Sequence, residues 1–271
     1  MEIFRETGDY TGEHSITFRD MYGTEKDTNS DWHLVPTSRP AVAPPEIKEK
    51  LLDNPGGDGI IDLTESVTGF PIYGQRKGSW DFYVLNGWRT WSDIYSEILN
   101  FMHGKNINVI LGDDPDYYYN GRVSVSQWAS DKDHSKITLN YNLDPYKLSM
   151  STSDEEAWKW DPFNFEKDVI VPKIMGNIDF NGTKTIEILG SEFGRRPVTP
   201  EFKLNSGTCT KISLYNPELW GNTPVVHENL STTSKNHFMD MIMSAFNPKN
   251  KLKIVIQGTG NMSIVYRPGK L

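Results

Sequence analysis

Two acidic segments are the strongest candidates for chemistry in this sequence of 271 residues. Asp53–Asp62 combines three aspartates with three glycines, and Asp113–Asp116 holds three aspartates around a proline. The first segment lacks the Lys-Ser/Thr pair of a phosphate-binding loop and the spacing and closing Glu of an EF-hand, and the proline of the second disturbs calcium-ligand geometry. We therefore expect both segments to be turns, the first of them leading into a strand that contains Ile60, Ile61 and Leu63.

The other reactive residue types match no catalytic or metal-binding pattern. There is no HExxH, GxSxG, paired-cysteine or strand-following GxGxxG motif, and the six histidines lack metal-ligand spacing. His227 and Glu228 are adjacent, but such a dipeptide is more often loop polarity than an acid–base pair. The single cysteine, Cys209, is expected to be a buried apolar residue. The sequence thus predicts neither an enzyme nor a metal or cofactor, although the carboxylate pair of a glycosidase would leave no sequence mark.

The overall composition indicates a globular protein with enough apolar material for two cores. Hydrophobic residues make up 37% of the chain and aromatic residues 12%. The net charge of -8 disfavours nucleic-acid binding, because a grip on phosphates requires clustered Lys and Arg. No apolar run approaches the length of a membrane span, and the first ten residues lack the basic and apolar regions of a signal peptide. We expect a protein that is synthesised and folded in a cytoplasm and that binds neither nucleic acid nor membrane.

The element around which the rest of the chain is organised is a long hairpin within Asp113–Met150. Apolar and polar residues alternate in two segments, 122–126 and 136–143, and a polar run separates them. A single apolar face requires a second layer to cover it, so the hairpin predicts a β-sandwich. Trp91–His103 supplies the one clear helix, with apolar residues at helical spacing and Gly104 after its end.

A proline-rich segment, Asp31–Pro45, is a candidate for contact with another chain. It holds four prolines, and proline cannot donate a hydrogen bond to a central strand ladder. We expect the segment to be extended, edge-lying or wrapped over another surface. If it wraps over a neighbouring subunit, Trp32, Pro36 and Pro40 are its candidate contact residues.

A cluster at the start of the hairpin is the second interface candidate. Tyr and Arg are favoured at the centres of interfaces. The members of the cluster are Tyr117, Tyr118, Tyr119 and Arg122. The tyrosines could equally be ordinary residues of the core and of the sheet ends.

The composition changes abruptly at residue 150. A polar and acidic run is followed by several aromatic residues, so residues 150–167 are predicted to be a linker with an aromatic segment, between an N-terminal domain (1–149) and a C-terminal domain (168–271). The aromatic residues either dock the linker on a domain or form a platform that stacks on sugar rings. Trp158 and, further along, Trp220 are the candidate stacking residues.

The C-terminal domain shows short alternating strands, which are typical of an all-β sandwich. Asn181-Gly182 is the dipeptide preferred by a type I′ turn, so we expect a tight hairpin there. Residues 234–246 fit a helix and a strand about equally well, and in both cases they belong to the core.

The order and spacing of several segments resemble those of the distal tail proteins of long-tailed siphophages and of related prophages of Gram-positive hosts. The segments cover most of the chain. They are PGGDGIIDLTE (55–65), YGQRKGSWDFYV (73–84), WRTWSDIYSEILNFMHG (88–104), YYYNGRV (117–123), LDPYKL (143–148), WKWDPFNFE (158–166) and NMSIVYRPGKL (261–271).

The resemblance implies a mainly β chain of two β-sandwich domains. The N-terminal domain, with one packed α-helix, would form a homo-hexameric ring coaxial with the tail channel, and the C-terminal domain would be a galectin-like sandwich that projects outward. The ring would be a hub in the virion tail tip, between the major tail-tube protein and the tail-associated hub protein, often with receptor-binding or side-fibre proteins attached. Unlike some family members, this chain is expected to have no long inserted arm and no extra carbohydrate-binding module.

Two other functions are compatible with the sequence. The first is a lectin that binds host surface glycans through exposed aromatic residues such as Trp158 or Trp220. The second is an enzyme that acts on wall polysaccharide, which no catalytic motif supports. Both are less favoured than a structural tail-tip protein.

Overall fold

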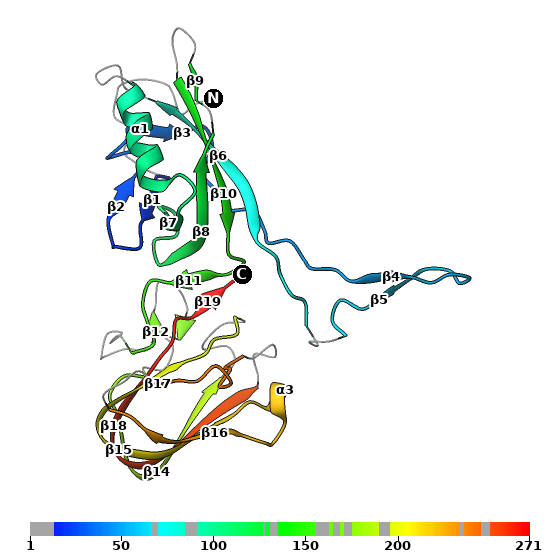
Figure 1. Ribbon diagram of the computed structural model, residues 1–271, viewed down its shortest axis with the longest axis vertical. Coiled ribbons are helices and arrows are strands. Elements are labelled where there is room, and N and C mark those ends of the chain that lie inside the picture. The colour runs from blue at the N-terminus through cyan, green and yellow to red at the C-terminus, as the bar shows by residue number, and fades with distance from the viewer. Residues whose placement is uncertain are drawn as a thin grey trace. The chain divides into compact units, whose positions relative to one another are not determined.

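The computed structural model describes residues 14–66, 70–84, 91–126, 128–130, 135–154, 163–164, 169–170, 175–189, 196–232, 236–244 and 250–271. The chain divides into two compact units, Met1–Lys147 and Leu148–Leu271. Both are built from antiparallel strands that curl into β-sandwich domains, which confirms the predicted fold class (Figure 1). Among the described residues, no helix is long and apolar enough to cross a membrane.

The first unit is built on an antiparallel sheet whose main path has the order β2-β1-β7-β8-β10-β6-β3. A short strand, β9, pairs with the beginning of β10. The strands are β1 (Ile16–Arg19), β2 (Glu25–Asp27), β3 (Leu34–Pro36), β6 (Arg76–Val84), β7 (Asn106–Leu111), β8 (Tyr117–Val125), β9 (Ala129–Ser130) and β10 (Ser135–Leu143).

Strands β8 and β10 form the predicted long hairpin. Val125 lies opposite Leu139, and Val123 lies opposite Tyr141. All four side chains are buried, whereas Arg122, one position along β8, is exposed. The period-two pattern of the sequence therefore assigned the two faces correctly.

Helix α1 (Trp91–Met102) confirms the predicted helix and covers the apolar face of the sheet. Ile94, Ile98 and Met102 are buried in the same core as the hairpin residues. Gly104 follows with a φ of 72°, the left-handed conformation in which many helices end.

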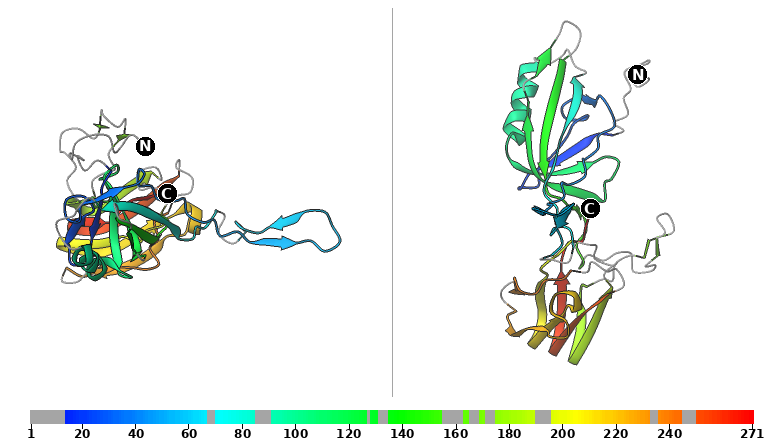
Figure 2. Two further views of the ribbon diagram at one scale, coloured as in Figure 1. Left: turned by 90° about the horizontal axis from the view of Figure 1, so that it is seen from above. Right: turned by 90° about the vertical axis from the view of Figure 1, so that its right-hand side faces the viewer.

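Strands β4 (Leu51–Asp53) and β5 (Ile60–Asp62) form a separate two-stranded ribbon in the first unit. The glycine-rich residues 54–59 make the turn between them, as the sequence predicted. The ribbon extends away from the sheet (Figure 1; Figure 2). The expectation that the chain has no long inserted arm is therefore wrong. We call residues 46–66 and 70–74 the arm.

The second unit contains a five-stranded antiparallel sheet in the order β14-β18-β15-β16, with β17 paired to β15. Further short strands lie at the start of the unit and at its C-terminus. The elements are β11 (Lys147–Ser149), β12 (Phe163–Asn164), β13 (Val169–Ile170), β14 (Ile178–Leu189), β15 (Glu201–Tyr215), α3 (Pro217–Trp220), β16 (Val225–Leu230), β17 (Asn236–His237), β18 (Lys251–Val265) and β19 (Gly269–Lys270).

A row of glycines lets the long strands of this sheet bend. Gly182 lies opposite Gly258 and Gly207 lies opposite Gly260, and all four have φ between 82° and 157°. A Cβ atom at any of the last three would come within 2.1 Å of a backbone oxygen of the neighbouring strand. The prediction of a tight hairpin at Asn181-Gly182 is therefore wrong, because β14 continues through this dipeptide with unbroken pairing to β18. The positive φ of Gly182 bends the strand and does not make a turn.

Residues 236–244 resolve the ambiguity between helix and strand. They contain β17 and a bridge between Val198 and Met243, and no helix. Met241 and Met243 are buried in the core of the second unit, as expected for either alternative, whereas Met239 is 73% exposed.

Candidate subunit interface

Three of the predicted contact residues lie in the core of the first unit. Trp32 has no exposed surface, and Pro36 and Pro40 are also buried. The proline-rich segment follows its own sheet, where the carbonyl oxygen of Ala41 accepts a hydrogen bond of 2.8 Å from Trp80 Nε1. We therefore correct the assignment of these three side chains from a neighbouring subunit to their own domain, because the segment supplies β3, the edge strand of the sheet, which pairs with β6.

The tyrosines at the start of β8 do not form one cluster. Successive side chains of a strand point to opposite faces, so Tyr117 and Tyr119 lie on the apolar face, and Tyr118 lies on the polar face with Arg122. All three rings are half-buried. The ammonium group of Lys147 lies 4.5 Å from the centre of the Tyr117 ring. The structure therefore leaves Tyr118 and Arg122 as the members of the predicted cluster on the polar surface.

Of the two tryptophans predicted to stack on sugar rings, only Trp220 lies in the described part of the chain. Trp158 lies outside the described residues. Trp220, the last residue of α3, is half-buried and packs against the core of the second unit. The side chain of Trp220 therefore helps to hold α3 in place.

The acidic segment after β7 is a turn held by ion pairs. The carboxylate of Asp113 lies 2.6 Å from His14 Nδ1 and 2.6 Å from Arg39 Nε, and Asp114 pairs with Lys147 at 2.5 Å. Burial alone would raise the pKa of Asp113, but the hydrogen bonds from Arg39 and His14 outweigh it and hold the pKa below its ordinary value. In the described part of the chain, no three potential ligands gather in a metal-binding cluster.

The arm carries most of the exposed apolar surface of the first unit. Eight large apolar side chains of this unit are exposed among the described residues, and six of them belong to the arm, with exposed fractions of 40–64%. They are Ile47, Leu51, Leu52, Ile60, Ile61 and Ile72. A two-stranded ribbon is only marginally stable in water when nothing covers it, so these residues point to a partner surface.

The two faces of the ribbon carry different chemistry. Leu52 and Ile61 are paired across the strands and share one face, which is apolar. Leu51, Asp53, Ile60 and Asp62 share the other face, where each apolar residue lies beside an aspartate. Both faces expose apolar side chains, so contact on one side only would leave apolar surface in water.

The arm is acidic and long. Residues 46–65 contain six acidic and two basic residues, a net charge of -4. The distance from Glu46 to the turn at Gly57 corresponds to about 40 Å at roughly 3.3 Å per residue. An arm of this length can cross the whole width of a neighbouring domain of similar size.

The root of the arm is fixed to the sheet of the first unit. Gly74 N donates to Glu46 O at 2.6 Å, and Tyr73 packs edge-on against Tyr146. Arg76, which is 5% exposed, donates from Nε to Pro145 O and from Nη1 to Ala43 O, both at 2.8 Å. Burial lowers the pKa of the Arg76 guanidinium, but not enough for this strongly basic group to lose its charge.

Replacing Arg76 with alanine is expected to destabilise the first unit by about 2–4 kcal/mol, because two partly buried carbonyl groups lose a charged donor. The measurement is the urea midpoint of unfolding, followed by tryptophan fluorescence. The neighbouring Lys77 is exposed, so Lys77→Ala should change stability by less than about 0.5 kcal/mol. Equal effects of the two substitutions would contradict a special role for Arg76.

A second exposed apolar feature is the turn between β1 and β2. Met21 is 82% exposed and Tyr22 is 85% exposed. The turn is ordered by Asp20, whose Oδ1 accepts hydrogen bonds from the backbone N–H groups of Tyr22 at 2.9 Å and Thr24 at 2.8 Å. A preordered turn that displays two large apolar side chains is suited to contact a partner, since little conformational entropy is lost on binding.

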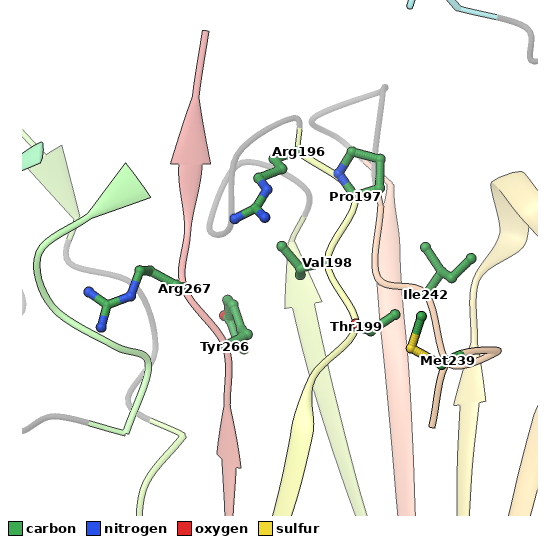
Figure 3. A pocket seen from close by; sticks show the side chains of 8 residues that line it. All are labelled: Arg196, Pro197, Val198, Thr199, Met239, Ile242, Tyr266 and Arg267. Atoms are coloured by element: carbon green, nitrogen blue, oxygen red, sulfur yellow. The ribbon is translucent and has the colours of Figure 1, made fainter. Parts of the chain in front are cut away.

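The second unit contains a pocket of about 340 Å³ between the start of β15 and the end of β18. In Figure 3, Met239 and Ile242 lie on one side of the pocket, Arg196 and Arg267 on the other, and Val198 between them. Arg267 Nη1 donates to the carbonyl oxygens of Ser149 and Met150. The pocket therefore combines apolar walls with cationic groups.

Comparison with known proteins tests the fold of the whole chain. No protein family profile matches the sequence, and no curated protein matches it. Among solved structures, the chain is similar to the SPP1 Dit protein (gp 19.1), described as a paradigm of hub adsorption apparatus in phages that infect Gram-positive bacteria. The similarity covers 94% of this chain and 99% of that one, with a TM-score of 0.53 and 15% sequence identity.

The chain has the Dit fold. This confirms the resemblance that the sequence suggested, at the level of the fold. Within this Dit fold, the arm, the Met21–Tyr22 turn and the pocket rim at Met239 are three exposed apolar features of the described residues. The sequence predicted the strand and the turn of the arm but not their exposure to solvent. It gave no indication of the role of Arg76, of the exposed Met21–Tyr22 turn or of the pocket rim at Met239. The one available signal was the glycine-rich turn between two very short apolar runs, which indicates a ribbon too small for its own core.

Proposed function

We propose that the chain is a structural subunit of a phage tail tip, where six copies form a ring that acts as a hub. The similarity of fold to a hub protein supports the tail-tip role. The observation that carries the proposal is the arm, because it exposes apolar side chains on both faces and is anchored firmly at its root.

An arm that docks on a different surface of a second copy makes a head-to-tail contact, and such contacts close into a ring when the rotation permits. Fully burying a Leu or Ile side chain is worth about 1.5–3 kcal/mol. Leu51, Leu52, Ile60 and Ile61 are each about half exposed, so covering them would contribute on the order of 3–6 kcal/mol per arm. Six such contacts would stabilise a closed ring strongly.

In the proposed assembly, the first unit forms the ring and the galectin-like second unit projects from it. The ring joins the major tail-tube protein to the tail-associated hub protein and holds receptor-binding or side-fibre proteins at its periphery. The ordered Met21–Tyr22 turn is suited to one of these contacts, as are Tyr118 and Arg122 on the polar face. The protein would thus belong to the virion tail tip, after synthesis in the cytoplasm of a bacterial host.

The glycan-binding alternative has no observation in its favour. Trp220 contributes to the core of the second unit, and the structure does not describe Trp158. We therefore propose a single function, that of a structural hub.

The purified full-length chain is expected to form six-fold rings in negative-stain images, with a mass near six times the 30.9 kDa of one chain by light scattering. Tail-tube and hub proteins added together should increase the fraction in rings. A chain that stays monomeric at high concentration, with both proteins present, would overturn the proposal.

A further inference from the structure

One face of the arm presents an acidic group that has no partner in the described structure. Asp53 and Asp62 share this face with Leu51 and Ile60. Hydrogen bonds from the side chain of Thr64 and from its backbone N–H, the latter at 2.8 Å, lower the pKa of Asp62. Asp53 makes no side-chain hydrogen bond or ion pair with the residues that the structure describes. Its carboxylate lies between two exposed apolar side chains and has no counter-ion in the described part of the chain.

The pocket of the second unit has the complementary character. Arg196 lines it and makes no hydrogen bond or ion pair within the described ranges of the chain, whereas the guanidinium of Arg267 is held by backbone carbonyls. Val198 lies between Arg196 and the apolar side chains of Ile242 and Met239 on the other side of the pocket, and Met239 is the most exposed large apolar side chain described in this unit (Figure 3). The pocket thus offers a cation on one side and apolar surface on the other, where the arm offers an anion beside apolar side chains.

We propose that the acidic face of the arm of one copy docks in this pocket of a second copy, with Asp53 paired to Arg196. The proposal rests on the proposed ring and names one contact between its neighbouring copies. Leu51 and Ile60 then cover Val198, Ile242 and Met239, and the other face of the ribbon, with Leu52 and Ile61, covers a further surface of the assembly.

Three features of the chain favour the arm as the occupant. The net charge of -4 over residues 46–65 complements a pocket lined by two arginines. The reach of about 40 Å suffices for a contact well outside the subunit. The pocket volume is at the lower end of the range of ligand sites, about 300–1,000 Å³, and suits the few side chains of one ribbon face.

The Met21–Tyr22 turn is the other apolar element that could enter the pocket. Its acidic residue, Asp20, already accepts two backbone hydrogen bonds on Oδ1. The carboxylate of the turn is therefore already engaged within its own loop, whereas that of Asp53 is not engaged among the described residues, which makes the arm the better match.

Charge reversal tests the pairing in the full-length chain. Asp53→Arg alone and Arg196→Asp alone should each lower the fraction of chain in rings at least ten-fold, and the double variant should restore it. An equimolar mixture of the two single variants should also recover rings, because a reversed arm then meets a reversed pocket on another copy. Restoration by the double variant without recovery in the mixture would show that the arm docks on its own chain, and would overturn the contact between copies.

Disulfide trapping gives an independent readout. The only native cysteine, Cys209, is buried, so Asp53→Cys with Arg196→Cys introduces the reactive pair. Oxidation should yield a ladder of covalent oligomers on a non-reducing gel, whereas the matched pair Asp53→Cys with Lys184→Cys, on an exposed part of β14, should not. Rings of the native chain with neither charge dependence nor a ladder would overturn this contact and leave the ring proposal intact. Absence of rings in the native chain, with no ladder, would overturn both.

Discussion

Replacing Leu52 and Ile61 with serine is expected to leave the chain folded and to abolish ring formation. These two side chains form the apolar face of the ribbon and make no contribution to either core. Each is about half exposed, so the pair loses on the order of 1.5–3 kcal/mol of burial per contact. Because a closed ring needs every contact, the loss is repeated around it. The measurements are light scattering for mass and circular dichroism for folding.

The matched control is Leu219→Ser with Val226→Ser. These side chains are also exposed, at 37% and 38%, but they belong to the second unit, outside both the arm and the pocket. The control should form rings as the native chain does. Rings of the Leu52→Ser and Ile61→Ser variant at native abundance would show that the apolar face of the arm is not an interface.

Substitution of Gly258 by alanine is expected to destabilise the second unit by at least about 4 kcal/mol, a large part of the 5–15 kcal/mol that stabilises a typical domain. Gly258 has a φ of 136°, and an added Cβ would lie 2.1 Å from Thr208 O. That oxygen belongs to the backbone of the paired strand, so the strands would have to separate for the methyl group to fit. Urea unfolding should show the transition of the second unit moved to low denaturant and that of the first unit unchanged.

Gly182→Ala is the control, because it changes the same residue type in the same row. Its φ of 82° is also unfavourable for alanine, but no atom lies within 4 Å of the added Cβ. It should therefore show only the conformational cost of the left-handed region, about 1–2 kcal/mol. If the two alanine variants were equally stable, close approach of the strands would not be the reason for the glycine row.

The sequence by itself determined the elements whose residue pattern has a local cause. The period of two in β8 and β10 fixed which residues face the core, and the helical spacing of apolar residues, with Gly104 at their end, fixed α1. The turn between β4 and β5 followed from three glycines that relieve backbone strain. These predictions were confirmed because each depends on neighbours within a few residues along the chain.

Only the tertiary structure decided which of these elements are covered. Trp32, Pro36 and Pro40 are residue types expected at an interface, but their segment forms the edge strand β3 beside β6, and the domain itself buries them. Leu52 and Ile61 are apolar residues of the kind found in core strands, but no described part of the first unit covers the ribbon, so their side chains are exposed. Asn181-Gly182 is a dipeptide that favours a tight turn, but continuous pairing with β18 keeps it within strand β14. Burial depends on residues far away in the sequence, which is why a local pattern identified the strand and turn of the arm and only the fold revealed it as a candidate interface.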